Sequence, residues 1–361
     1  MQKTSLDFAT AVCKTMIKKY AAKDLPPVGK FHYHQGVFLS GMQKIYKLTG
    51  EKTYYMYIKE WVDSLVDENG YFPVAAEDEL DDYQPAILLF DLYQETKEEK
   101  YKRALERTVN LIKKQSCNQY GGFWHKHHRV NEMWLDGMYM AGPFMAEYGS
   151  NFKYESFYDV VHLQMSLMHE HNRDGKTGLY YHAWKALGEA DWANPVTGCS
   201  PEFWGRAIGW FVTAMFDIAE KLPETYEKRD DFISVGIELI DSLLKYQDKT
   251  TGLWYQVIDK GHISRNWHEV SCSCLILHAI CKAIRMGYLD EAYKVHAQKA
   301  YDGIIATLGY DGEDVLVQKV CIGTGICTFQ QYIDRPTSTN DLHGVGAFLL
   351  MCSEYYRAMG E

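Results

Sequence analysis

One stretch of the chain places a single carboxylate among large apolar side chains. In Trp134-Leu135-Asp136-Gly137 that carboxylate belongs to Asp136. A buried charge is costly unless it is paired, neutralised or kept protonated, and a protonated carboxyl group can serve as a general acid. Gly137 lets the backbone bend or a ligand approach. We therefore predict a catalytic role for Asp136; the simpler alternative is that it caps the helix that follows.

Polar residues that could complete such a site occur in three other places. Asp81 lies in an acidic run, residues 77–83, which could equally be a solvated helix N-terminus. His125 and Lys126 begin a His-Lys-His-His run that could donate hydrogen bonds to an anionic ligand. No Cys or second His pair stands at zinc spacing from this run, so we expect no metal. His182 is a further candidate, although a surface loop would also accommodate it.

The fourth cluster surrounds an arginine. Arg206 stands between Trp204 and Trp210, with two glycines nearby. A guanidinium group in this setting suits a fork that grips a carboxylate, and the alternative is an arginine stacked on tryptophan for structural reasons. One acid, a second carboxylate, several cations and many aromatic rings together predict a carbohydrate enzyme that acts on an acidic sugar.

Composition excludes several other classes of protein. The 361 residues are 47% hydrophobic and carry a net charge of −10, with no run dense in Lys and Arg, which argues against a nucleic-acid partner. No apolar run approaches transmembrane length. The nine cysteines, an odd number, and a first helix that does not resemble a signal peptide lead us to expect reduced thiols and a cytoplasmic location.

A repeated helical pattern must position these residues. Long helices end in short turns of Gly plus aromatics that start at Gly70, Gly121, Gly178 and Gly252, about 50 to 75 residues apart. The predicted helices cover residues 5–22, 35–48, 52–67, 81–96, 98–115, a segment ending near 148, 154–171, 201–221, 231–247, 269–286, 290–308 and 342–359. Six hairpins can remain an open array or close into a ring. Closure would gather the polar loops at one mouth, so we predict an all-α (α/α)6 barrel with a single domain, residues 1–361.

Two motifs point to a known family. The motif W-x-D-G-x-Y-M, which begins at Trp134, and the motif W-G-R-x-x-G-W, which begins at Trp204, resemble those of the unsaturated rhamnogalacturonyl hydrolases of glycoside hydrolase family 105. The resemblance extends over essentially the whole chain and implies an (α/α)6 barrel without a cofactor or metal. The implied substrate is an acidic pectin oligosaccharide with a 4,5-unsaturated galacturonate at its non-reducing end, typically linked to rhamnose.

The resemblance also assigns roles to residues. Asp136 matches the general acid and Asp81 the second active-site aspartate. The implied substrate-binding positions are Trp134, His125, Lys126, His182, Trp204, Arg206 and Trp210. Where the family favours a tyrosine in the early loop, this chain offers both Tyr33 and His34. The loop at residues 323–337 is harder to match, which leaves the accepted length of substrate and the preferred neighbouring sugar open.

The expected chemistry is hydration rather than direct glycosidic cleavage. Asp136 would protonate C4 of the C4=C5 enol ether and then take a proton from the water that adds at C5. We expect burial beside Trp134 and the nearby charge of Asp81 to raise the pKa of Asp136. Arg206 or Lys126 would hold the uronate carboxylate.

Three other readings remain open at this stage. A sister family of unsaturated glucuronyl hydrolases, which acts on glycosaminoglycan fragments, would share the fold and chemistry. A zinc-dependent helical toroid could use the thiols of Cys272, Cys274 or Cys321, although cysteine buried in a helix core explains these residues as well. A non-catalytic binding solenoid would not need a sequestered acid. The oligomeric state is left open.

Overall fold

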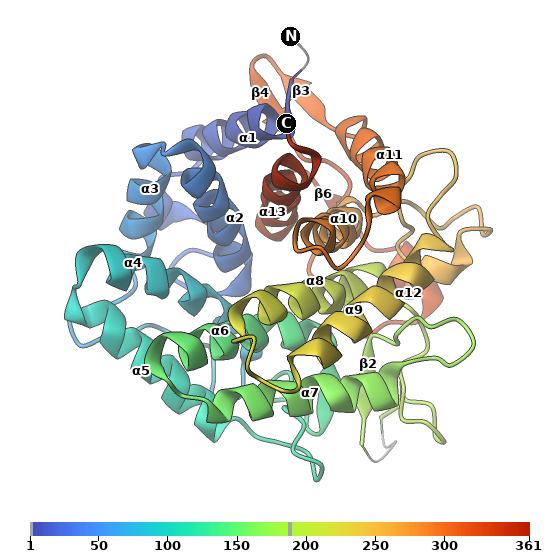
Figure 1. Cartoon of the computed structure of the whole chain (residues 1–361), viewed down its shortest axis with the longest axis horizontal. Coiled ribbons are helices and arrows are strands. Elements are labelled where there is room, and N and C mark those ends of the chain that lie inside the picture. Colours follow the sequence, from blue (N-terminus) through green and yellow to red (C-terminus); the bar gives the residue numbers. More distant parts are fainter. Residues whose placement is uncertain (1–2, 187–189) are drawn as a thin grey trace.

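Paired helices close into a double ring in the computed structural model, which describes residues 3–186 and 190–361 (Figure 1). The inner helices of the described residues are α2 (Tyr33–Thr49), α4 (Leu88–Thr96), α6 (Asp136–Phe152), α8 (Gly205–Lys221), α10 (Val270–Arg285) and α13 (Leu342–Met359). The outer ones are α1 (Ser5–Lys19), α3 (Lys52–Asp63), α5 (Glu99–Lys114), α7 (Ser156–Asn172), α9 (Arg229–Leu244) and α11 (Lys294–Ile305). Because α13 packs against α2 as well as α10, the ring is closed. The predicted (α/α)6 barrel is confirmed.

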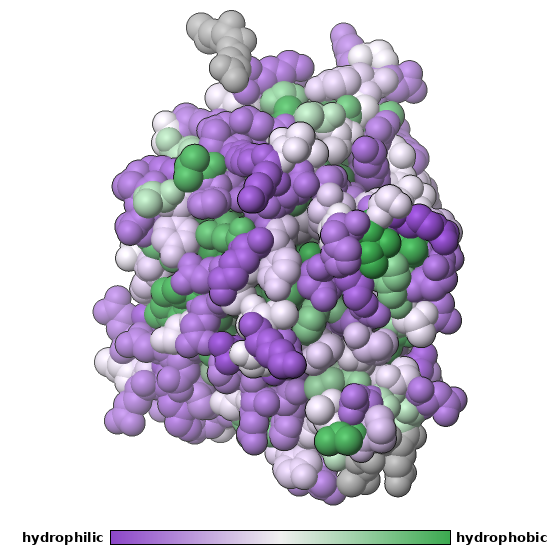
Figure 2. All heavy atoms as spheres, turned by 90° about the vertical axis from the view of Figure 1, so that its right-hand side faces the viewer, coloured by the Kyte–Doolittle hydropathy of each residue, from purple (hydrophilic) through white to green (hydrophobic). Residues whose placement is uncertain are grey.

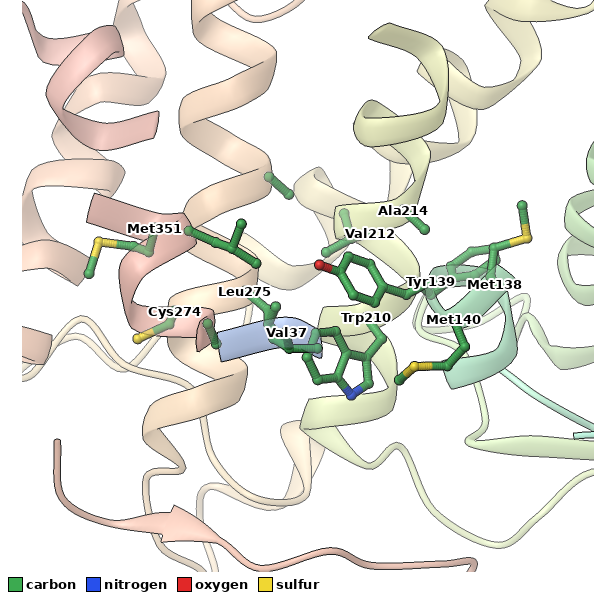
Figure 3. Close-up of a cluster of buried hydrophobic side chains, with 14 of the residues drawn as sticks. Val37, Met138, Tyr139, Met140, Trp210, Val212, Ala214, Cys274, Leu275 and Met351 are labelled. Atoms are coloured by element: carbon green, nitrogen blue, oxygen red, sulfur yellow. The ribbon is translucent and has the colours of Figure 1, made fainter. Parts of the chain in front are cut away.

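Burial separates the two layers as expected from their sequences. Every residue of α10 from Val270 to Ile284 is buried, whereas the outer helix α5 is strongly amphipathic and turns its charges to solvent. Inner helices meet in an apolar cluster that includes Val37 of α2, Trp210 of α8 and Leu275 of α10 (Figure 3). This core fixes the inner helices and therefore the loops at their N-terminal ends.

Several predicted helix boundaries were wrong by three residues or more, most of all the start of α4. The segment expected to be helical from residue 81 begins instead with two 3-10 turns, Leu80–Asp82 and Gln84–Ile87, and α4 starts only at Leu88. Pro85 lacks a backbone N–H and opens the second turn, which delays the regular helix. The helix expected from residue 201 starts at Gly205, and a short helix, α12 (Phe329–Ile333), was not predicted.

Short strands join the loops at the ends of the helices. β1 (Glu132–Trp134) pairs with β2 (Ala183–Lys185), β3 (Gly309–Asp311) with β4 (Asp314–Leu316), and β5 (Val320–Cys321) with β6 (Thr337–Ser338), all antiparallel. The sequence did not predict these pairs, because strands of two or three residues are too short to show a period. Their importance lies in the loops that they hold together.

The glycine of each repeated turn adopts a conformation that other residues avoid. Gly70, Gly121, Gly178 and Gly252 have φ between 75° and 86°. At Gly252 the backbone N–H donates to the carbonyl oxygen of Asp248, 2.8 Å away. A Cβ at this position would lie 2.4 Å from the carbonyl oxygen of Lys299. The turn therefore needs glycine for both its backbone angle and its lack of a side chain.

The surface is predominantly polar on the face seen in Figure 2, where hydrophobic side chains form small separate groups. No helix of the described residues is long and apolar enough to cross a membrane.

Replacing Gly252 by alanine should destabilise the fold more than the same change at Gly50. Both glycines have positive φ, 77° and 70°, but a Cβ at Gly50 meets nothing within 4 Å. Gly50→Ala should cost about 1–2 kcal/mol for the left-handed backbone alone. Gly252→Ala adds the clash with Lys299, about 1–3 kcal/mol more. Urea unfolding of both variants measures the difference, and equal losses would rule out the clash.

Candidate active site

A cavity of about 360 Å³ opens at the end of the barrel where inner helices begin. Predicted site residues that line it are Tyr33, His34, Asp81, His125, Lys126, Trp134 and Asp136. Gly323 and Gly325 line another part of the cavity wall. Closure of the ring thus brings residues between positions 32 and 140 together with residues 323–325, as the sequence pattern predicted.

Strand pairing places Asp136 beside His182. Trp134 lies opposite Ala183 in the β1–β2 pair, and the backbone N–H of Leu135 donates to the carbonyl oxygen of His182 at 3.0 Å. Asp136 follows as the first residue of α6, and no side chain caps this helix end. Its Oδ2 lies 3.1 Å from Nε2 of His182, out of hydrogen-bond alignment. The helix-cap alternative therefore does not describe this carboxylate.

The pKa of Asp136 differs from the prediction. Burial raises this pKa, as expected, and so does the charge of Asp81. The electrostatic attraction of the adjacent His182, aided by that of His125, outweighs both and holds the pKa of Asp136 below its usual value. The expectation of a raised pKa was wrong for the protein without substrate, because the sequence did not show that the His182 ring lies against the carboxylate.

Asp81 is held as an anion by two partners. Lys126 Nζ donates to its Oδ2 at 2.5 Å, and His125 Nε2 lies 3.3 Å from its Oδ1. Burial alone would raise the pKa of Asp81, but Lys126 and then His125 bring it well below the usual range. Lys126 is also bound by Glu79 at 2.9 Å. Asp81 is only 5% exposed, so the alternative of a solvated helix N-terminus does not apply to this residue of the acidic run.

Stacked rings build the wall between the two carboxylates. The His125 ring stacks on Trp134 with centroids 4.6 Å apart and an angle of 16°. Trp134 Nε1 donates to Glu132 at 3.1 Å, and its ring meets His182 edge-on at 5.2 Å. The backbone supports this arrangement, because the N–H of His125 donates to the carbonyl of Glu132 and the N–H of Leu80 donates to the carbonyl of His125.

Four predicted binding residues lie behind the cavity wall: the fully buried His182, and Trp204, Arg206 and Trp210. The Arg206 side chain is 1% exposed, and its Nη1 and Nη2 donate to the carbonyl oxygens of Cys321 and Ile322. Its guanidinium lies 4.5 Å from the Trp204 ring, as the structural alternative expected. Trp210 packs on Tyr139 in the apolar cluster (Figure 3). Trp204, Arg206 and Trp210 do not line the cavity, so their direct contact with substrate stays a prediction that this geometry does not favour.

The family of the chain follows from its similarity to known proteins. Residues 8–359 match the model of Glycosyl Hydrolase Family 88. The chain belongs to this family. It is similar to a family 105 glycoside hydrolase from C. acetobutylicum, with 33% identity over 96% of this chain and 98% of the other and a TM-score of 0.91. The predicted resemblance is confirmed, and the protein is a glycoside hydrolase.

Two further proteins are similar to this family 88 chain, one in sequence and one in fold. It is 26% identical to the unsaturated rhamnogalacturonyl hydrolase YesR of Bacillus subtilis, over 81% of this chain and 79% of that protein. The unsaturated glucuronyl hydrolase of Bacillus sp. GL1 shares 14% identity at a TM-score of 0.73, over 99% of this chain and 96% of that one, which shows a common fold.

Some residues of the family 88 site escaped the sequence analysis. Tyr332 of α12, within the loop left open at residues 323–337, places its hydroxyl 2.7 Å from His182 Nδ1. Tyr33 and His34, the two candidates in the early loop, both line the cavity. Asp341 and His343 lie beside His34. No sequence signal marked Tyr332, because its partner lies 150 positions away.

The thiol-based zinc alternative finds no cluster in the described part of the chain. Groups with spacing suitable for a metal consist there of His34, Asp341 and His343, and of Glu79, His127 and His128. Cys272 and Cys274 are buried within α10, as expected of core cysteines.

The stability of the protein should depend on pH through Asp82. Burial raises the pKa of this carboxyl to about 7, and the charges of Asp81 and Glu79 act in the same direction, although the Ala75 N–H donates to it. Between pH 4 and 7 the folded protein then keeps a proton that the unfolded chain loses, so stability falls as pH rises. Each unit of difference corresponds to about 1.4 kcal/mol.

Asp82→Asn should remove this part of the pH dependence, because asparagine does not titrate and can still accept from Ala75. Urea unfolding from pH 4 to 8 should show the variant gaining stability relative to the wild type as pH rises, by up to about 4 kcal/mol. Parallel stability curves for the two proteins would contradict the raised pKa.

Proposed function

We propose that this glycoside hydrolase removes the 4,5-unsaturated galacturonate from the non-reducing end of rhamnogalacturonan oligosaccharides. The observation that carries the proposal is the pair of buried carboxylates in one cavity, Asp136 against His182 and Asp81 against Lys126. Similarity to YesR along most of both chains supports the galacturonate-rhamnose substrate.

The chemistry starts at carbon rather than at the glycosidic oxygen. Asp136 donates a proton to C4 of the C4=C5 double bond, and the ring oxygen stabilises the cation that forms at C5. Water attacks C5 and gives its proton to the Asp136 carboxylate. The resulting hemiketal opens and releases the neighbouring sugar. One carboxyl group thus acts first as acid and then as base, in contrast with the two-carboxylate division of labour in ordinary glycosidases.

Asp136 has to be protonated before it can act as the acid, and substrate binding has to bring this about. Without substrate the lowered pKa keeps Asp136 ionised at neutral pH. A bound uronate brings a second anion and displaces water, and both changes raise the pKa of a neighbouring carboxyl group. His182, 3.1 Å from Asp136 and in contact with the Tyr332 hydroxyl, is placed to pass on the proton.

Asp81 contributes a fixed negative charge. Lys126 contacts one carboxylate oxygen of Asp81 and His125 contacts the other, so Asp81 does not need to exchange protons during turnover. This charge favours the cation at C5. Lys126, whose side chain is partly exposed and lines the cavity, is better placed than Arg206 to meet the substrate carboxylate.

Asp136→Asn should abolish turnover while leaving the fold intact. The conjugated enol ether absorbs ultraviolet light and hydration removes that absorbance, so the decay of the signal measures the reaction on an unsaturated galacturonyl-rhamnose disaccharide. Loss of the proton donor should slow the decay by about 10²–10⁴-fold or more. The matched control is Asp231→Asn, at an exposed carboxylate outside the cavity, which should react at the wild-type rate. Undiminished turnover by Asp136→Asn would reject the assignment.

A second substrate separates the sister activity. Decay with an unsaturated glucuronyl disaccharide from a glycosaminoglycan, but none with the galacturonyl-rhamnose disaccharide, would move the protein to glucuronyl hydrolysis. Decay with neither would remove support for uronyl hydrolysis altogether.

Arg206→Ala should lower stability and weaken binding together. The change removes two hydrogen bonds from a charged donor, at about 1.5–3 kcal/mol each. The carbonyl oxygens of Cys321 and Ile322 keep only their contacts with His343 and Thr324. The adjoining Gly323 and Gly325 line the cavity, so the loosened loop should also raise KM. Urea unfolding and steady-state kinetics measure the two effects. A higher KM with unchanged stability would instead indicate that Arg206 grips the substrate directly.

A further inference from the structure

Three potential metal ligands converge beside the cavity, and one of them, His34, lines it. His34 is the second residue of α2. Asp341 is the N-cap residue of α13 and His343 is the second residue of that helix, and these two inner helices pack side by side. His343 Nδ1 lies 2.8 Å from Asp341 Oδ1, and His34 Nε2 lies 3.9 Å from the same oxygen. The ligand atoms of all three residues lie within 4.8 Å of one another.

The contacts behind His343 determine which nitrogen carries its proton. Nε2 of this fully buried ring lies 3.1 Å from the carbonyl oxygen of Cys321. Because a carbonyl oxygen only accepts, Nε2 carries the hydrogen, and neutral His343 then turns the lone pair of Nδ1 toward Asp341. The 2.8 Å contact there lacks hydrogen-bond alignment. In the neutral ring two acceptors would face each other without a donor between them, whereas a protonated ring would donate to Asp341 and lower the pKa of that carboxyl group.

His34 presents a third acceptor to the same point. Its Nδ1 lies 3.1 Å from Nδ1 of His32, which also faces the backbone N–H of His34. When His32 accepts, the hydrogen of His34 is on Nδ1, and the lone pair of Nε2 is left for the Asp341 side.

We propose that His34, Asp341 and His343 bind a divalent transition-metal ion, of which Zn²⁺ is the best match. Two imidazole nitrogens and one carboxylate oxygen form a ligand set that suits this ion, and three protein ligands leave a position for water or another ligand. The second nitrogen of His343 donates to a backbone carbonyl, which is the usual way in which a ligating histidine is oriented. This inference departs from the metal-free site expected from the sequence.

The other cluster of histidines and a carboxylate offers a weaker site and a matched control. His127 and His128 are exposed, and their partner Glu79 is already neutralised by Lys126, 2.9 Å away. A metal ion there would have to compete with the lysine and with water. Substitutions at His127 and His128 therefore remove as many histidines as changes at His34 and His343 without touching the proposed site.

A metal ion at this position would act on the substrate. His34 lines the same cavity as Asp136, which places the proposed ion next to the space that the substrate would occupy. On the basis of the proposed function, the ion would attract the uronate carboxylate and lower KM, with little effect on kcat. This consequence can fail without affecting the metal site itself.

The test is zinc binding by the full chain, purified without a polyhistidine tag and stripped with a chelator. Titration calorimetry with Zn²⁺ and elemental analysis after gel filtration should find one ion per chain in the wild type and in the His127→Gln/His128→Gln double variant. His34→Gln and His343→Gln should each weaken binding by about 100-fold or more. Co²⁺ should give visible absorption bands that disappear in the same two variants.

Two controls keep the result interpretable. Circular dichroism shows whether His343→Gln, at a fully buried position, still folds; His34→Gln at a half-buried position carries the test if it does not. No zinc in the wild type, or zinc that is lost only from the His127/His128 variant, would overturn the proposal and leave His343 as a protonated partner of Asp341. Because binding is measured without substrate, failure of the proposed hydrolytic activity would not alter this result.

Discussion

The antiparallel pairing of β1 with β2 is the contact on which the site depends. It joins the loop before α6 to the loop between α7 and α8, so that two successive helical hairpins share one hydrogen-bonded wall. The register places Trp134 opposite Ala183, and the next backbone bond sets Asp136 against His182. A shift by one residue would turn each side chain to the other face and separate this pair. Two three-residue strands thus hold the proposed acid and its histidine partner together in a barrel built mainly of helices.

Two buried carboxylates can share the cavity because each has its own partner. Lys126 and His125 hold Asp81, and His182 lies against Asp136, so that the pKa of both acids is lowered in spite of burial. Their different partners suit different tasks. A lysine keeps its proton and fixes Asp81 as an anion, whereas an imidazole can exchange a proton at neutral pH, which suits the proposed acid if it has to be protonated when substrate binds.

Several motif residues support the cavity from behind its wall. Arg206 ties down the backbone at Cys321 and Ile322, next to the glycines of the wall, and Trp204 stacks on Tyr332, whose hydroxyl contacts His182. Motif residues can therefore be essential to a site without touching its ligand. Their side chains satisfy buried backbone carbonyls, which would otherwise lose hydrogen bonds in the interior.

The sequence by itself determined the barrel and the residues of the local motifs. Helical periodicity and the repeated glycine turns specify the hairpins, and Asp136, Asp81 and Lys126 reach the cavity because they stand in the loops before inner helices. Only the tertiary structure decided the direction in which the pKa of Asp136 moves, the side on which Arg206 lies and the meeting of His34 with His343. These outcomes depend on contacts between segments far apart in the chain, and the closure of the ring, not the spacing along any one helix, brings those segments together.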